Sequence, residues 1–209
     1  MNKALTKETE IMKQPLKSAL LGGASVLAAV GTVLIPAAAF AAVDTKTTTV
    51  NAILAPVISM TTGTTVNINI TPTPSGAASN GSDTVTVATN RSTGYNLKLA
   101  GATVTLVSGA NNIAAASGSF ASPAALGNNS WGYRVDNAGT FGAGPTSTQT
   151  NQASLAGTWA SVPTVAQTIK TTATTATADV TTVWYGVMAD TSKPDGTYAD
   201  IITYTATTN

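Results

Sequence analysis

Apolar side chains alternate with Thr, Asn, Gly or charged residues over much of the chain. Seven runs show this period of two: residues 66–70, 84–87, 95–99, 104–106, 131–135, 183–187 and 198–206. Such a period places apolar groups on one face of a strand and polar groups on the other. The pattern therefore predicts strands that bury one face, and no stretch after residue 41 has a convincing helical period.

Turn-forming residues separate these runs, as at 72–76, 108–109 and 137–139, and Asn80-Gly81 is interpreted as a further turn. The strongest turn, Lys193-Pro194-Asp195-Gly196, predicts a hairpin-like close over residues 190–207. Many short strands with regular turns predict an all-β fold, a single antiparallel Ig-like β-sandwich over residues 50–209. The Ala-rich stretches 113–116 and 122–126 are expected to form at most a turn or two of helix.

Two segments depart from this pattern. Residues 140–163 are rich in Gly, Ser, Thr and Gln, with Phe141, Leu155 and Trp159 as their large apolar groups. A loop of this length is typically functional or disordered. Residues 42–49 are polar and are expected to form a flexible lead-in.

The N-terminus carries an export pattern. Lys3, Lys7, Lys13 and Lys17 precede an uncharged, apolar stretch at 18–35, and Pro36 leads into Ala39-Phe40-Ala41. A basic region, an apolar region and small residues at the exit are typical of a secretory signal peptide. We expect a signal helix at residues 1–41, cleaved between Ala41 and Ala42, so that membrane contact is limited to this segment before cleavage. An uncleaved anchor is the alternative.

The charge and the cysteine content of the chain limit its kind of partner and its means of stabilisation. The leader holds four of the 10 basic and two of the 9 acidic residues, which leaves six and seven, a net charge of −1. Without a basic cluster the mature chain has no electrostatic footprint for nucleic acid. There is no Cys, so an exported domain must rely on its core and sheet hydrogen bonds instead of disulfides.

Two segments resemble known surface domains. DGTYADIITYTATTN (195–209) resembles the last hairpin of the WxL cell-wall and spore-coat-U type domains, and VTVATNRSTGYNLKLAG (85–101) resembles the middle of the WxL type. With NSWGY (129–133), the layout is similar to Thr-rich surface proteins of candidate-phyla (Saccharibacteria-like) bacteria. The resemblance implies an Ig-like sandwich on a bacterial surface without enzymatic activity. The Trp-x-Leu tripeptides that name the WxL family are absent, so no ligand residue carries over.

Catalytic chemistry is poorly represented. No His supplies a base for a Ser or Thr nucleophile, and the remaining option is a Ser–Lys dyad with Lys98 or Lys170. The carboxylates of the mature chain are all Asp and mostly stand beside turns, where Asp bonds its own backbone. Zinc lacks Cys and His ligands, and the one calcium candidate is Asp190, Asp195 and Asp200 around a single loop. We expect no cofactor.

Three functions stay open. The first is a secreted, non-catalytic cell-surface protein, an adhesin or envelope-structural sandwich that binds a wall polymer, a glycan or a protein of another cell. Its contact residues would lie in the long loop, at an exposed Trp159 with Phe141 and Gln149. The second is a polymerising pilus- or coat-type subunit that self-associates when residues 50–62 add to a neighbour's sheet edge. The third is a small secreted carbohydrate-active enzyme.

Overall fold

The computed structural model describes residues 43–209. The chain divides into two units, Met1–Val50 and Asn51–Asn209. The expected signal peptide and its cleavage residues Ala39, Ala41 and Ala42 lie outside the described residues. Residues 43–50 are extended, exposed and without secondary structure. Within the described part of the chain no residue is helical, and no helix long and apolar enough to cross a membrane occurs.

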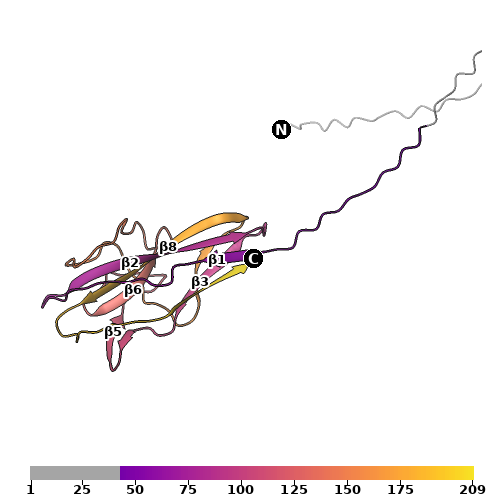
Figure 1. Ribbon diagram of the computed structural model, residues 1–209. Coiled ribbons are helices and arrows are strands. Elements are labelled where there is room, and N and C mark those ends of the chain that lie inside the picture. Colours follow the sequence, from indigo (N-terminus) through magenta and orange to yellow (C-terminus); the bar gives the residue numbers. More distant parts are fainter. Residues whose placement is uncertain (1–42) are drawn as a thin grey trace, which may run out of the picture. The chain divides into compact units, whose positions relative to one another are not determined.

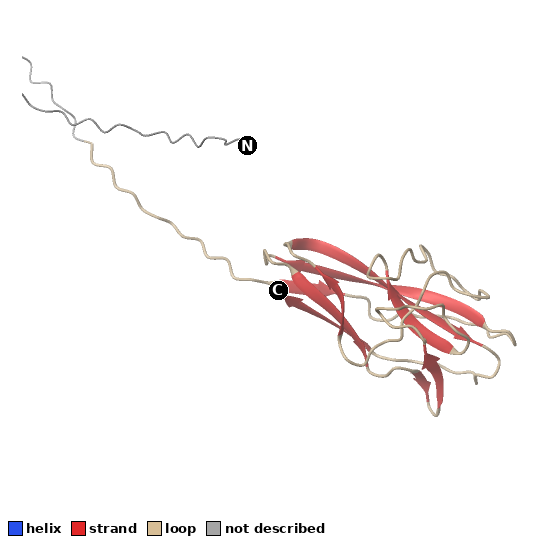
Figure 2. Cartoon of the chain, turned by 180° about the vertical axis from the view of Figure 1, so that it is seen from behind, coloured by secondary structure: helices blue, strands red, loops and turns tan. Residues whose placement is uncertain are grey.

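The second unit consists of nine strands in two sheets (Figures 1 and 2). The strands are β1 (Ile58–Thr61), β2 (Ala77–Thr89), β3 (Tyr95–Gly101), β4 (Leu106–Ser108), β5 (Asn111–Ala115), β6 (Ser130–Val135), β7 (Gln167–Thr171), β8 (Ala176–Ala189) and β9 (Ile202–Thr208). One sheet has the order β1-β2-β8-β6-β5-β4, and the other has the order β7-β3-β9. All pairs are antiparallel except β5 with β6, which are parallel.

The main core lies between the two sheets and follows the alternation in the sequence. Val85 and Val87 of β2 face inward with Leu97 and Leu99 of β3, and all four are fully buried. The expected strands at 84–87, 95–99, 131–135 and 183–187 are confirmed within β2, β3, β6 and β8. The two longest strands, β2 and β8, pair with each other inside the larger sheet (Figure 1).

Residues 66–70 do not form the expected strand. Val66, Ile68 and Ile70 are half-buried and alternate with exposed Asn67 and Asn69, yet the segment joins no ladder. A Cβ at Gly81 of β2 would lie 2.7 Å from Val66 Cγ1 and 3.3 Å from Ile68 Cγ1. The segment therefore packs its apolar side chains over Gly81 instead of pairing backbone with β2.

Three further expectations are corrected. Residues 113–115 belong to strand β5 and not to a helical turn, and Asn80-Gly81 lies inside β2 and not in a turn. Residues 190–207 do not form a hairpin, because β8 pairs with β2 and β6 whereas β9 pairs with β3 in the other sheet. The Pro194 turn thus belongs to a connection that crosses between sheets, which local turn chemistry does not distinguish from a hairpin.

Candidate functional site: the packed loop and the uncovered edge

The long loop 140–163 buries its large apolar side chains, Phe141, Leu155 and Trp159, while most of its polar residues stay exposed. Leu155 and Trp159 form a second, smaller core with Ala78 and Trp184 on the larger sheet, outside the main core. An ideal Cβ at Gly186 of β8 would lie 2.8 Å from both Leu155 Cδ1 and Trp159 Cζ3. The absent side chain at Gly186 therefore gives the indole room to lie against the sheet.

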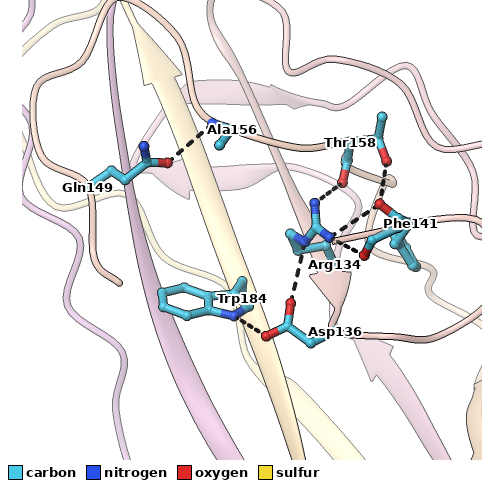
Figure 3. Close-up of polar contacts among 8 residues, drawn as sticks. Arg134, Asp136, Phe141, Gln149, Ala156, Thr158 and Trp184 are labelled. Carbon is cyan, nitrogen blue, oxygen red and sulfur yellow. Dashed lines mark hydrogen bonds and ion pairs between the residues drawn. The ribbon is translucent and has the colours of Figure 1, made fainter. Parts of the chain in front are cut away.

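A buried arginine fastens this loop to β6 (Figure 3). Arg134 is fully buried, and its Nη2 donates to the carbonyl oxygens of Phe141 at 3.2 Å and Gly142 at 2.9 Å. Its Nη1 donates to the carbonyl oxygen of Thr158 at 3.3 Å. Both ends of the loop therefore converge on one guanidinium.

Asp136 balances the charge of Arg134. Arg134 Nε lies 3.7 Å from Asp136 Oδ1, an electrostatic contact too long for a hydrogen bond, while Asp136 Oδ2 accepts a 2.8 Å bond from Trp184 Nε1. Burial lowers the pKa of Arg134 and the nearby Asp136 opposes that shift. Arg134 also stands 5.9 Å from the ring centre of Phe141 and 6.0 Å from that of Trp159, within cation–π range.

Gln149 forms hydrogen bonds with other residues of the domain. Its backbone N–H donates to Asn80 Oδ1 at 2.6 Å, and its carbonyl oxygen accepts from Asn80 N at 2.9 Å. Its side-chain Oε1 accepts from Ala156 N at 3.2 Å (Figure 3). Gln152 exchanges two backbone bonds with Ala78. This part of the loop thus pairs with the backbone of β2 at residues 78–80, on the strand whose other end, residues 86–89, pairs with β1.

The exposure expected of Trp159 is therefore corrected. Trp159 and Phe141 are 0% and 3% exposed, so neither presents a ring to a partner, and Gln149 is half-buried. Phe141 packs in the main core, 5.9 Å from Tyr133 between ring centres. The expectation of an exposed Trp159 was wrong because polar flanking residues also occur where a loop folds back onto a sheet.

The three aspartates of the calcium candidate serve separate turns. Asp190 accepts from Asn128 Nδ2 at 2.6 Å and Asn129 Nδ2 at 2.9 Å, whereas Asp200 accepts from Thr103 N at 3.0 Å. Asp195 is exposed in the bend between them. Within residues 43–209 no three acidic, His or Cys side chains gather closely enough to hold a metal ion, so this candidate is not supported.

Asp190 supports an acid-sensitivity prediction. Bonds from Ser192, Asn129 and Asn128 lower its pKa from 3.8 to about 2. Because the folded pKa is the lower one, its stabilising effect is complete above the unfolded pKa and is lost as pH falls from about 4 to about 2. We expect Asp190→Ala to lower Tm near neutral pH, and the difference from wild type to shrink at pH 2 in thermal melts.

Asp195→Ala is the matched control, since it removes a carboxylate from the same connection without removing those bonds. Its Tm should follow that of wild type at both pH values. An Asp190→Ala deficit that stays equally large at pH 2 would show that the carboxylate charge is not the stabilising group.

A shallow hollow contains the lysine considered for a dyad. Its volume is about 560 Å³, and its lining consists of residues 135–139, 169–171 and 180–182. Lys170 Nζ donates to Asp179 Oδ1 at 2.6 Å and to the Val180 carbonyl oxygen at 3.2 Å. Burial alone would raise the pKa of Asp179, but hydrogen bonds from Lys170 and Tyr95 outweigh it and lower that pKa. The lysine is thus placed as an ion-pair partner, and no Ser lines the hollow.

The most distinctive surface is an edge at which the main core is left partly open. On β3 the inward side chains Tyr95, Leu97 and Leu99 are fully buried. Their neighbours on β9, Tyr204 opposite Leu99 and Ala206 opposite Leu97, are only half-buried. We use the name "uncovered edge" for these half-buried apolar residues of β9 and of the segment before β2: Ile58, Met60, Val66, Ile68, Ile70, Ile202, Tyr204 and Ala206.

The uncovered edge is tied across the two sheets at one point. The hydroxyls of Tyr185 in β8 and Tyr204 in β9 lie 2.7 Å apart, and burial raises the pKa of both. β1 approaches β9 without forming a ladder with it. The alternation at Ile202, Tyr204 and Ala206 predicts inward-facing side chains and carries no sign that the core beside them stays partly open.

A second apolar surface precedes the first strand. Val50, Ile53 and Leu54 are 88%, 94% and 79% exposed. Residues 55–57 are held at the turn after β2, because Asn90 Nδ2 donates to the Ala55 carbonyl oxygen and Asn90 Oδ1 accepts from Val57 N, both at 2.8 Å. The apolar residues before this anchor are left in solvent.

Comparison of the chain with protein-family models, with curated proteins and with solved structures gives no match.

Proposed function

We propose that this protein is exported and serves as a non-catalytic structural or adhesive protein of a bacterial cell surface, built as an Ig-like β-sandwich. The secretory pattern of residues 1–41, the resemblance of residues 85–101 and 195–209 to surface domains, and the low charge support this proposal. Its partner is a wall polymer, a glycan or a protein of another surface.

The observation that carries the proposal is a contrast between charged side chains that make bonds within the described domain and apolar side chains that are left open. Arg134 holds the loop, Lys170 pairs with Asp179, and Asp190 accepts bonds from its neighbours. Apolar groups, in contrast, remain open at the uncovered edge and at Val50–Leu54. Exposed apolar surface of this kind is typical of interaction sites, which supports a binding or structural role.

Surface location is tested on intact cells that make the protein. Mild protease treatment of whole cells should remove the domain from the cell fraction, while a cytoplasmic marker protein stays intact. Equal protection of both proteins in intact cells, with digestion of both after lysis, would overturn the proposal.

Processing gives a separate prediction. Mass spectrometry of the mature protein should find an N-terminus at Ala42, because Ala39 and Ala41 supply the small side chains a signal peptidase requires. Ala41→Arg should leave the full-length precursor in the membrane fraction, and Ala38→Ser, which keeps a small residue outside the two critical positions, should be processed normally. An unprocessed wild-type chain would favour the uncleaved anchor.

The second candidate, a polymerising subunit, is favoured by the coexistence of an open sheet edge and an exposed apolar segment in one chain.

A further inference from the structure

We infer that residues 50–55 of one copy add as a strand to the β9 edge of a second copy, which links the subunits head to tail. The inference rests on the proposed structural role at the cell surface and names the partner for it, a second copy of this chain. It uses two features that the domain leaves unsatisfied, an unpaired strand edge and an exposed apolar segment.

The outer edge of β9 has free backbone groups. Ala102 N donates to the Ile201 carbonyl oxygen, and Asn209 N donates to the Gly94 carbonyl oxygen. These two bonds show that the odd-numbered residues of β9 form the hydrogen-bonded pairs with β3. Residues 203, 205 and 207 therefore bond to β3, and the backbone groups of 202, 204 and 206 point to the other side. No backbone bond from the described residues satisfies them on that side.

One added strand could both pair with the free backbone groups of β9 and cover its half-buried apolar side chains. The residues whose backbone points outward, Ile202, Tyr204 and Ala206, are also those whose side chains face the incompletely covered core. A strand added here would place alternate side chains over that core and its others in solvent. It would close the core between β9 and the segment at residues 58–70.

Residues 50–55 match these requirements. The sequence Val-Asn-Ala-Ile-Leu-Ala is uncharged, as is β9 itself, and an extended run of six residues spans about 20 Å, close to the length of seven-residue β9. One face would carry Val50, Ala52 and Leu54 toward the core. Pro56 follows and lacks the N–H that a longer ladder would need, so it ends the pairing segment.

The segment does not serve its own domain. Two hydrogen bonds with Asn90, one donated to the Ala55 carbonyl oxygen and one accepted from Val57 N, fix residues 55–57 directly before β1 begins at Ile58. Reaching the β9 of the same copy would require a reversal within these residues, whereas hairpins need at least two turn residues of suitable conformation. The high exposure of Ile53 and Leu54 agrees that their own domain does not bury them.

The geometry favours an open chain of subunits. The anchor at Asn90 belongs to the same turn as Thr93 and Gly94, where Asn209 ends the chain after β9. A copy that gives its segment to a neighbour leaves its own β9 edge free for a third copy. Such a heterologous contact propagates as a filament unless its rotation closes a ring.

Engineered cysteines test the placement, because the protein has no Cys. With Val50, Ala52 and Leu54 inward, side chains at 51 and 53 share the outer face with Thr205, which is exposed. Mature chains carrying Asn51→Cys or Ile53→Cys should cross-link under mild oxidation to chains carrying Thr205→Cys. Thr47→Cys, which precedes the segment, is the control and should cross-link at background level.

Sedimentation velocity tests whether the contact drives assembly. Wild-type Ala42–Asn209 should form oligomers that grow with concentration, and Val50→Asp/Leu54→Asp should lose them, because two carboxylates would be buried without partners. Thr47→Asp/Thr48→Asp adds the same charge outside the segment and should assemble like wild type.

Three results would overturn the inference: a monomer at all concentrations, cross-links no more frequent than with Thr47→Cys, or a 53/205 double-cysteine chain that cross-links only within itself. Capture by lipid vesicles alone, with the chain monomeric in their absence, would also overturn it in favour of a membrane contact. If the chain is a monomer but is found on the surface of intact cells, the strand contact is wrong and the proposed function still holds. If the chain assembles but is found only inside cells, the proposed function is wrong and the strand contact still holds.

Discussion

Arg134→Ala is expected to destabilise the domain by about 3–5 kcal/mol, the range for removing one partner of a buried ion pair. The substitution removes the donors for the carbonyl oxygens of Phe141, Gly142 and Thr158 and leaves Asp136 without its counter-charge. Buried acceptors without donors cost more than the bonds themselves contribute. Urea unfolding should show the loss as a lower midpoint.

Two variants accompany this measurement. Arg134→Lys keeps the charge but cannot reach two carbonyl oxygens with a planar fork, so its stability should lie between wild type and Arg134→Ala. Lys98→Ala removes a charge from a half-exposed position on β3 and should change stability by about 0.5 kcal/mol or less. If Arg134→Ala matched Lys98→Ala, the guanidinium would not be what fastens the loop.

Trp159→Ala is expected to cost a further large amount, about 3–5 kcal/mol, as for other fully buried aromatic side chains. The indole fills the space above Gly186 and packs with Leu155 and Trp184. Its loss would leave a cavity on the outer side of the sheet and free residues 140–163 to open. Limited proteolysis should therefore cut the variant within this loop at conditions that leave wild type intact.

Val165→Ala is the control, since that side chain is 81% exposed just after the same loop. It should leave both stability and protease resistance unchanged. A Trp159→Ala protein as stable as wild type that had lost binding to a glycan or wall polymer would restore Trp159 to the role of a ligand contact.

The period-two alternation predicted the central strands because their inward side chains are apolar at every second position. In β2, β3, β6 and β8 every second side chain faces the core, and the sequence records this directly. The same pattern at 66–70 gave side-chain burial without a ladder, because Gly81 lets Val66 and Ile68 sit on top of β2. Alternation reports which faces are buried and does not report which backbones pair.

The candidate site was predicted less well, for a different reason. Trp159 stands among polar residues, and its burial depends on Gly186 and Arg134, which are distant in sequence. Likewise the alternation at 202–206 could not reveal that the core beside it stays uncovered. The sequence shows that residues 50–55 are mostly apolar. Their exposure depends on how the rest of the domain packs, which the local sequence does not report.

Immunogold electron microscopy of intact cells tests the account most directly, with an antibody to the mature domain applied to cells making wild type or Val50→Asp/Leu54→Asp. Wild type should show rows of label on filaments or a continuous coat, and the variant should show scattered surface label at similar protein levels. Label confined to the cell interior, or identical patterns for the two proteins, would contradict it.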